Sequence, residues 1–184
     1  MALTYTPEAE LGQPCHEFTL PAVDGKTYSL NSFAQSKVLV LMFICNHCPY
    51  VKAVEDRLIA LGRFFKSSDV AFAAICSNDP TDHPEDTFEN LKARWSEKSY
   101  PFPYLHDREQ VVARAFDAVC TPDFFVYDSN RRLAYRGRLD DNWKDPSKIK
   151  SEDMKQAIQN LLNGMKISNQ QYPSMGCSIK WIGE

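Results

Sequence analysis

The chain has 184 residues, of which 43% are hydrophobic and 24% are charged, and its formal net charge is −3. This length supports one well-packed core, and the composition is typical of a soluble globular protein. The slight acidic balance with scattered basic residues argues against nucleic-acid and anionic membrane partners, and the longest apolar stretch, residues 38–45, is too short to span a bilayer.

The start of the chain and its cysteine content indicate the compartment. Residues 1–8 lack the basic segment and the apolar segment of a secretory signal. We therefore expect a cytoplasmic protein, in which the six cysteines do not form a disulfide framework.

The predicted elements alternate between strands and helices, read from apolar runs and from apolar residues at helical spacing. In chain order they are a hairpin (18–20 and 27–30), a central strand (38–44), a helix (47–65), a strand (70–76), a helix (84–99), a short strand (102–105), a short helix (109–119), a hairpin (124–127 and 133–138) and a final helix (151–162). This order predicts an α/β fold with a parallel core, helices on both faces and a late antiparallel hairpin.

Smaller signals set the expected boundaries. Asn46 is the expected N-cap of the first helix, and Asp82 and Glu85 have capping-box spacing before the second. We expect a single domain over residues 1–184. Its parts are a core at about 37–164, an N-terminal hairpin extension at 1–36 and a C-terminal tail at 165–184 without clear periodicity.

The sequence Cys45-Asn46-His47-Cys48 lies where the central strand meets the first helix. Two thiols at this spacing can close a small disulfide ring, and the positive end of the helix dipole favours a thiolate. The pattern indicates a site that exchanges electrons with another sulfur, with half a zinc site or two buried structural cysteines as alternatives. A second pair of zinc ligands at suitable spacing is not evident, so neither a metal nor a cofactor is expected.

A second feature is Thr121-Pro122, directly before the predicted strand 124–127. Together with the cysteine pair and the element order, it makes residues 15–164 resemble the thioredoxin superfamily. The resemblance implies a thioredoxin-like three-layer α/β/α sandwich with an N-terminal hairpin, an inserted helix and a C-terminal tail. It also implies a cis bond at Pro122, beside a backbone edge at Thr121 where substrate docks, although an ordinary trans proline is the alternative.

The longer string Cys45-Asn46-His47-Cys48-Pro49-Tyr50-Val51 and the tail residues 173–181 resemble peroxiredoxin-like proteins of the AhpC/TSA family (alkyl hydroperoxide reductase/thiol-specific antioxidant). Neither cysteine has the peroxiredoxin motif P-x-x-x-T-x-x-C, and Pro122 stands at the position of the arginine that peroxiredoxins use. Leu39 stands where thioredoxin has a buried acid, so proton transfer to the second thiol must come from another group or be slow.

The resemblance implies roles for the site residues. Cys45 is expected to be the exposed attacking thiol and Cys48 the buried resolving thiol. His47 and the helix N-terminus are expected to lower the pKa of Cys45, and Asn46 either tunes the thiolate or only caps the helix; a solvated His47 is the alternative. Cys177 either acts as an extra resolving or relay thiol or belongs to a tail that only packs on the core.

We therefore predict a thiol–disulfide oxidoreductase that uses a Cys45/Cys48 redox-active dithiol. Its expected partners are a disulfide-bearing protein or a small thiol substrate, and an external thiol reductant. One alternative is a peroxiredoxin-like thiol peroxidase with an antioxidant role and a hydroperoxide substrate. The other is a non-catalytic thioredoxin-fold module for binding or redox sensing.

Overall fold

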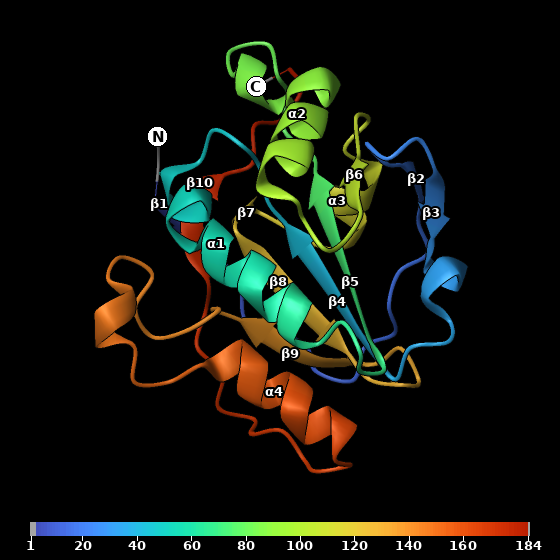
Figure 1. The fold of residues 1–184 in the computed structure, drawn as a ribbon, viewed down its shortest axis with the longest axis vertical. Helices are drawn as coiled ribbons and strands as arrows, with labels where there is room; N and C mark the ends of the chain where they lie inside the picture. Colours follow the sequence, from blue (N-terminus) through green and yellow to red (C-terminus); the bar gives the residue numbers. More distant parts are fainter. Residues whose placement is uncertain (1–2, 184) are drawn as a thin grey trace.

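The computed structural model describes residues 3–183, and its centre is a five-stranded sheet with the order β6-β5-β4-β8-β9 (Figure 1). Its strands are β4 (Val38–Phe43), β5 (Val70–Cys76), β6 (Tyr104–His106), β8 (Asp123–Tyr127) and β9 (Leu133–Gly137). β4, β5 and β6 are parallel, whereas β8 is antiparallel to β4 and β9 is antiparallel to β8. The predicted parallel core with a late antiparallel hairpin is confirmed.

Helices cover both faces of this sheet. The α-helices are α1 (Pro49–Phe64), α2 (Phe88–Lys98), α3 (Val111–Ala115) and α4 (Asp153–Leu162), and the 3-10 helices are η1 (Leu30–Phe33), η2 (Pro84–Asp86) and η3 (Pro146–Lys148). α1, α2 and α4 pack into one core. On the opposite face α3 packs with η1 and with the hairpin of β2 (Thr19–Pro21) and β3 (Thr27–Ser29). These layers confirm the predicted three-layer sandwich. No helix within residues 3–183 combines the length and the apolar character needed to cross a membrane.

β4 is the strand that positions the site. All six of its residues are buried, and they alternate between the core under α1 and the core under α3. A strand with apolar side chains on both faces belongs in the middle of a covered sheet, as the sequence predicted. Because β4 is fixed on both faces, the residues that follow it, from Ile44 onwards, start from a rigid position.

A second, small sheet joins the two ends of the chain. It has the order β1-β10-β7 and consists of β1 (Leu3–Tyr5), β10 (Met175–Ser178) and β7 (Cys120–Thr121). The tail was predicted only as a segment without clear periodicity, and the structure adds the strand β10 to it. Strands of two to four residues are too short to show alternation, so their pairing with distant segments is what defines them.

Two helix starts also differ from the predictions. The expected helix at 84–99 is divided into η2 and α2, because the Thr87 hydroxyl accepts a hydrogen bond from the Asn90 N–H and begins a new helix there. The capping box of Asp82 and Glu85 is therefore wrong. α1 has Cys48 as its N-cap, so the prediction of Asn46 as the cap is wrong as well.

Candidate functional site

The two cysteines lie on either side of the turn from β4 into α1. Cys45 follows β4, and Cys48 is the N-cap of α1, with extended backbone angles and Pro49 in the first turn. As the N-cap, Cys48 has its sulfur near the backbone N–H of Val51 in the first turn, which contributes to lowering the pKa of Cys48. The positive end of the helix therefore acts on Cys48.

Asn46 anchors the inserted segment instead of capping the helix. Its side-chain amide donates hydrogen bonds to the carbonyl oxygens of Glu85 (2.9 Å) and Asn90 (3.0 Å). These contacts tie the turn at the cysteines to η2 and the start of α2. Asn46 was expected to tune the thiolate, and the amide instead reaches two backbone carbonyls of the insertion.

Both sulfur atoms are buried, and Thr121 lies against them. Cys45 is 1% exposed and Cys48 is 0% exposed, so the prediction of an exposed Cys45 is wrong. The Thr121 hydroxyl lies 3.2 Å from the Cys45 sulfur, and the Cys48 thiol lies 3.1 Å from the Thr121 carbonyl oxygen, to which it can donate. The Thr121–Pro122 bond is cis, as predicted. The structure thus brings together the two cysteines and the two residues of the predicted docking edge.

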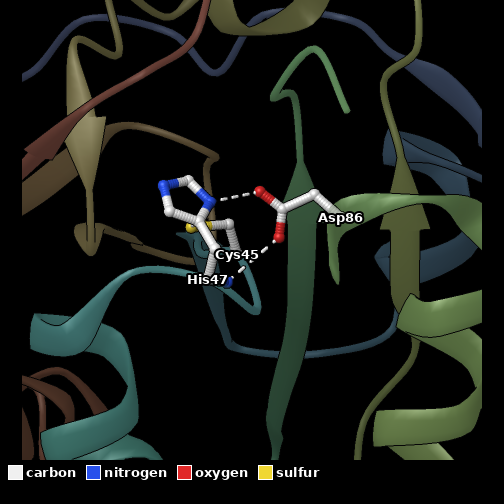
Figure 2. Close-up of side chains that lie close together, drawn as sticks. All are labelled: Cys45, His47 and Asp86. Atoms are coloured by element: carbon white, nitrogen blue, oxygen red, sulfur yellow. Dashed lines mark hydrogen bonds and ion pairs between the residues drawn. The ribbon is translucent and has the colours of Figure 1, made fainter. Parts of the chain in front are cut away.

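A buried carboxylate, Asp86, completes the site (Figure 2). Its Oδ1 accepts hydrogen bonds from the backbone N–H groups of Asn46 (2.7 Å) and His47 (3.2 Å). Its Oδ2 accepts from His47 Nδ1 (2.6 Å) and from the Asn78 amide (2.9 Å). Burial alone raises the pKa of Asp86, but these hydrogen bonds outweigh it and the net pKa is lowered.

Asp86 was missed by the sequence reasoning. It sits in the inserted segment, 38 to 41 positions after the four-residue cysteine motif, and no local pattern distinguishes it from the neighbouring acidic residues. Leu39 stands at the position where thioredoxin has a buried acid. In this structure Asp86 brings a buried acid to the site from a different element, η2. The sequence offered one signal, the polar turn that follows β5, because the carboxyl ends of parallel strands lie at the same edge of a sheet, where sites form.

His47 is held by Asp86 and is not a solvated loop residue. Its ring is buried, and it stacks on His83 with a centroid distance of 3.9 Å and an interplanar angle of 7°. Because Nδ1 donates to the carboxylate, the same atom, 3.6 Å from the Cys45 sulfur, cannot accept the Cys45 proton. His47 therefore orients the site through its N–H and is not a general base for Cys45.

The side chains of Cys45, His47 and Asp86 also lie close enough together to be candidate metal ligands. One donor atom each from Cys45, His47 and Asp86 lies within 4.8 Å of the others. However, the Asp86 oxygens already accept four hydrogen bonds, one of them from the His47 atom that a cation would need. A bound cation would have to break this network, so the donor set fits a hydrogen-bonded cluster better than a metal site.

The pKa values of the two thiols are shifted in opposite directions. Burial raises the pKa of Cys45, and the nearby Asp86 charge adds to this effect. Hydrogen bonds from the Cys45 thiol, the Val51 N–H, and the thiol and N–H of Cys177 outweigh burial and lower the pKa of Cys48 to about 5. The Thr121 carbonyl opposes ionisation because it accepts only from a thiol, but the donors outnumber it.

The prediction of a low pKa for Cys45 is therefore wrong: the pKa of Cys45 is raised, and that of Cys48 is lowered. The largest cause is the neighbouring Cys45 thiol. The start of α1 adds to it, because the helix begins after the second cysteine and its first turn lies beside Cys48 and not beside Cys45.

This assignment gives an expected titration. We expect the ultraviolet absorbance of a thiolate to appear with a midpoint far below the free-cysteine pKa of about 8.5, because donors surround the Cys48 sulfur. Cys48→Ser should remove this transition, and Cys45→Ala should move it to higher pH by removing one donor. A midpoint near the free value in the wild-type protein would contradict the assignment.

The Asp86 network has an expected effect on stability. Asp86→Asn places an amide NH₂ group against donors, and we expect the free energy of unfolding to fall by about 2 kcal/mol. Chemical denaturation measures this change. Asp82→Asn is the matched control, because Asp82 is exposed on the same segment and should leave the stability unchanged. Equal stability of the two variants would show that the network contributes little.

A pocket of about 260 Å³ opens beside Pro122. Aromatic rings of Tyr50, Trp143 and Tyr172 line it, and the first two rings lie 4.5 Å apart. The pocket reaches the proline next to Thr121, whose hydroxyl and carbonyl contact the two sulfurs. The pocket therefore adjoins the predicted docking edge of the cysteine pair.

Comparisons with known proteins are consistent with this geometry. A family model described as the AhpC/TSA family matches residues 11–136, which include both cysteines and Pro122. A crystal structure of an uncharacterized conserved protein from Geobacillus kaustophilus is 41% identical, with a TM-score of 0.94, and the match covers 100% of this chain and 98% of that one. A hypothetical protein from Sinorhizobium meliloti is 38% identical, with a TM-score of 0.92 and coverage of 98% and 100%.

More distant structures share the fold. A thiol:disulfide interchange protein of the thioredoxin family from Chlorobium tepidum is 18% identical, with a TM-score of 0.64, and the match covers 82% of this chain and 97% of that one. At this identity the likeness supports the thioredoxin-like fold and no more. A comparison with curated proteins finds no significant match.

Proposed function

The chain belongs to the AhpC/TSA family, and on that premise we propose that it is a thiol–disulfide oxidoreductase with Cys45 and Cys48 as its redox-active pair. One observation carries the proposal: both sulfurs lie against Thr121 at the start of α1, with the Cys45 sulfur 3.2 Å from its hydroxyl and the Cys48 sulfur 3.1 Å from its carbonyl oxygen, and the neighbouring Cys45 thiol lowers the pKa of Cys48. A thiolate beside a second thiol is the arrangement that disulfide exchange requires.

The proposed reaction begins at Cys48. Its thiolate attacks one sulfur of a substrate disulfide, a mixed disulfide forms on Cys48, and the other substrate sulfur leaves as a thiolate that takes up a proton. Cys45 then gives its proton to the second leaving sulfur and attacks Cys48, which closes the Cys45–Cys48 disulfide. Two electrons pass to the substrate, and an external thiol reductant restores the dithiol.

This sequence of steps exchanges the roles that the resemblance implied for the two cysteines. Cys45 keeps its proton in the resting site because it is buried and lies near the Asp86 charge. It becomes a nucleophile once the mixed disulfide has removed the Cys48 negative charge and a leaving thiolate is at hand to take the proton. Thr121, whose hydroxyl lies 3.2 Å from the Cys45 sulfur, holds this thiol in place.

Hydroperoxide reduction is the second candidate. The sequence lacks the peroxiredoxin threonine, but the Thr121 hydroxyl reaches the cysteine pair from β7. In this reaction the Cys48 thiolate takes one peroxide oxygen and becomes a sulfenic acid while an alcohol leaves. The Cys45 thiol then condenses with it to give the same disulfide and water.

Turnover with a dithiol reductant tests both candidates. The substrates are a small disulfide such as bis(2-hydroxyethyl) disulfide, insulin and an alkyl hydroperoxide, each compared with Cys48→Ser. Reduction of disulfides that depends on Cys48 is the expected result. A faster reaction with the hydroperoxide than with either disulfide would favour the second candidate, and no Cys48-dependent turnover would contradict both.

A further inference from the structure

The backbone edge of β7 beside the thiols is occupied by the chain's own C-terminal strand. β10 pairs antiparallel with β7, with Cys177 opposite Thr121 and Ser178 opposite Cys120. β1 pairs with the other side of β10, which lies against the start of α1 (Figure 1). Pairing along a sheet edge is how extended peptides bind to such folds, so β10 takes the place of an extended substrate.

Gly176 makes this contact unusually close. A Cβ atom at Gly176 would lie 1.8 Å from the carbonyl oxygen of Thr121 and 2.5 Å from its carbonyl carbon. No residue with a side chain fits there without movement of the strand. Two residues earlier, just before β10, the Ser174 hydroxyl donates to the Pro122 carbonyl (2.7 Å), so this segment of the tail contacts both residues of the predicted docking edge.

This strand carries Cys177 to Cys48. Cys177 is buried and lies opposite Thr121, whose carbonyl oxygen is 3.1 Å from the Cys48 sulfur, and the thiol and backbone N–H of Cys177 contribute to lowering the pKa of Cys48. Burial and this hydrogen bond raise the pKa of Cys177 to about 12. The Cys48 sulfur is thus in contact with two protonated thiols, one from the turn before α1 and one from β10.

We propose that Cys177 is a second resolving thiol for Cys48, so that the site is a three-thiol centre with Cys48 in the middle. The inference rests on the proposed function and extends it to the tail. It also bears on the substrate class: because β10 occupies the edge of β7, an extended peptide cannot pair there, so we expect a small disulfide that reaches the buried Cys48 sulfur when β10 moves away.

The chemistry is a thiol–disulfide exchange that balances without a further oxidant. When Cys48 carries a substrate sulfur, Cys177 attacks the Cys48 sulfur, the bond to the substrate breaks, and the Cys177 proton goes to the leaving thiolate. When the Cys45–Cys48 disulfide is already closed, Cys177 attacks Cys48, the bond to Cys45 breaks, and Cys45 takes the proton.

The test uses Cys45→Ser, in which Cys177 is the only proposed resolving thiol. One equivalent of bis(2-hydroxyethyl) disulfide is added, the mixture is quenched in acid and alkylated, and the disulfides are mapped by mass spectrometry. The expected product is a Cys48–Cys177 disulfide. The mixed disulfide on Cys48 should decay faster than in Cys45→Ser/Cys177→Ser by about tenfold or more, because the thiol is held beside it. Cys45→Ser/Cys120→Ser is the matched control, since Cys120 lies on β7 and its thiol points to the Pro122 carbonyl.

The outcomes separate this inference from the proposed function. A mixed disulfide that persists equally with and without Cys177 would overturn the three-thiol centre and leave the attack by Cys48 intact. No adduct at Cys48 in any variant would overturn both. A second measurement leaves Cys45 unchanged: the wild-type protein is oxidised, and its free thiols are then alkylated. We expect part of the protein to carry the label on Cys45 and a disulfide between Cys48 and Cys177. If Cys177 is the only one of the three thiols that is labelled, the result counts against the inference.

Discussion

Cys48→Ser is expected to lower kcat/KM for a small disulfide by about a thousandfold or more, because it removes the nucleophile itself. Cys45→Ser should behave differently. It keeps the Cys48 thiolate, so the first exchange still occurs and releases one equivalent of substrate thiol, and Cys177 can release a second equivalent by closing the Cys48–Cys177 disulfide. Thiol release measured over time without a reductant distinguishes this limited release from the loss of all release in Cys48→Ser.

Cys120→Ser is the control for both substitutions, because Cys120 is a buried cysteine on the neighbouring strand with no assigned step. Its activity should stay near the wild-type value. The opposite pattern, in which Cys45→Ser loses the initial release and Cys48→Ser retains it, would contradict the assignment and restore the roles that the family resemblance implied.

Gly176→Ala is expected to loosen the C-terminal strand from the thiols. The added methyl group would overlap the Thr121 carbonyl, so β10 must move away from β7. We expect the free energy of unfolding to fall by about 3 kcal/mol. We also expect alkylation of Cys48 by iodoacetamide to become faster by about tenfold or more, because opening of the strand limits access to the buried sulfur.

Ser178→Ala is the matched control for this substitution. Ser178 lies on the same strand, is half-buried, and opposes Cys120 and not Thr121. It should leave both the stability and the alkylation rate nearly unchanged. If Gly176→Ala lowers the stability but leaves the alkylation of Cys48 as slow as before, β10 is not the barrier to the site.

Local patterns in the sequence were enough to predict the central sheet. β4 is a six-residue apolar run, and burial on both faces follows from that composition alone. The apolar stripe of α1 likewise follows from spacing within one helix. The cysteine pair and the cis bond before Pro122 were found because motif and element order reinforce one another.

The remaining features depend on contacts between distant residues. Asp86 acts on Asn46 and His47 through hydrogen bonds across 39 or 40 positions, and no spacing rule connects them. β10 exists because Cys177 pairs with Thr121 and with Leu3 at the opposite end of the chain. A four-residue strand in an aperiodic tail carries no signal of these partners.

The assignment of the thiolate shows how a small local difference changes the chemistry. The sequence analysis predicted the helix N-cap at Asn46, and a helix that begins there would direct its N-terminus at Cys45. The structure places the cap at Cys48. This shift of two positions places the first turn of the helix beside the second sulfur, where it acts together with the Cys45 thiol to lower the pKa of Cys48, and this changes the expected order of attack.

The most direct test of the central claim is the reduction potential of the cysteine pair, measured in thiol–disulfide buffers with mass-spectrometric mapping of the bonds. We expect a two-electron transition that closes the Cys45–Cys48 disulfide. Its midpoint should be more positive than thioredoxin's value of about −270 mV, because the Cys48 thiolate stabilises the reduced form. If both cysteines stay open to alkylation after denaturation across the whole buffer range, the pair is not a redox couple and the proposed function is wrong.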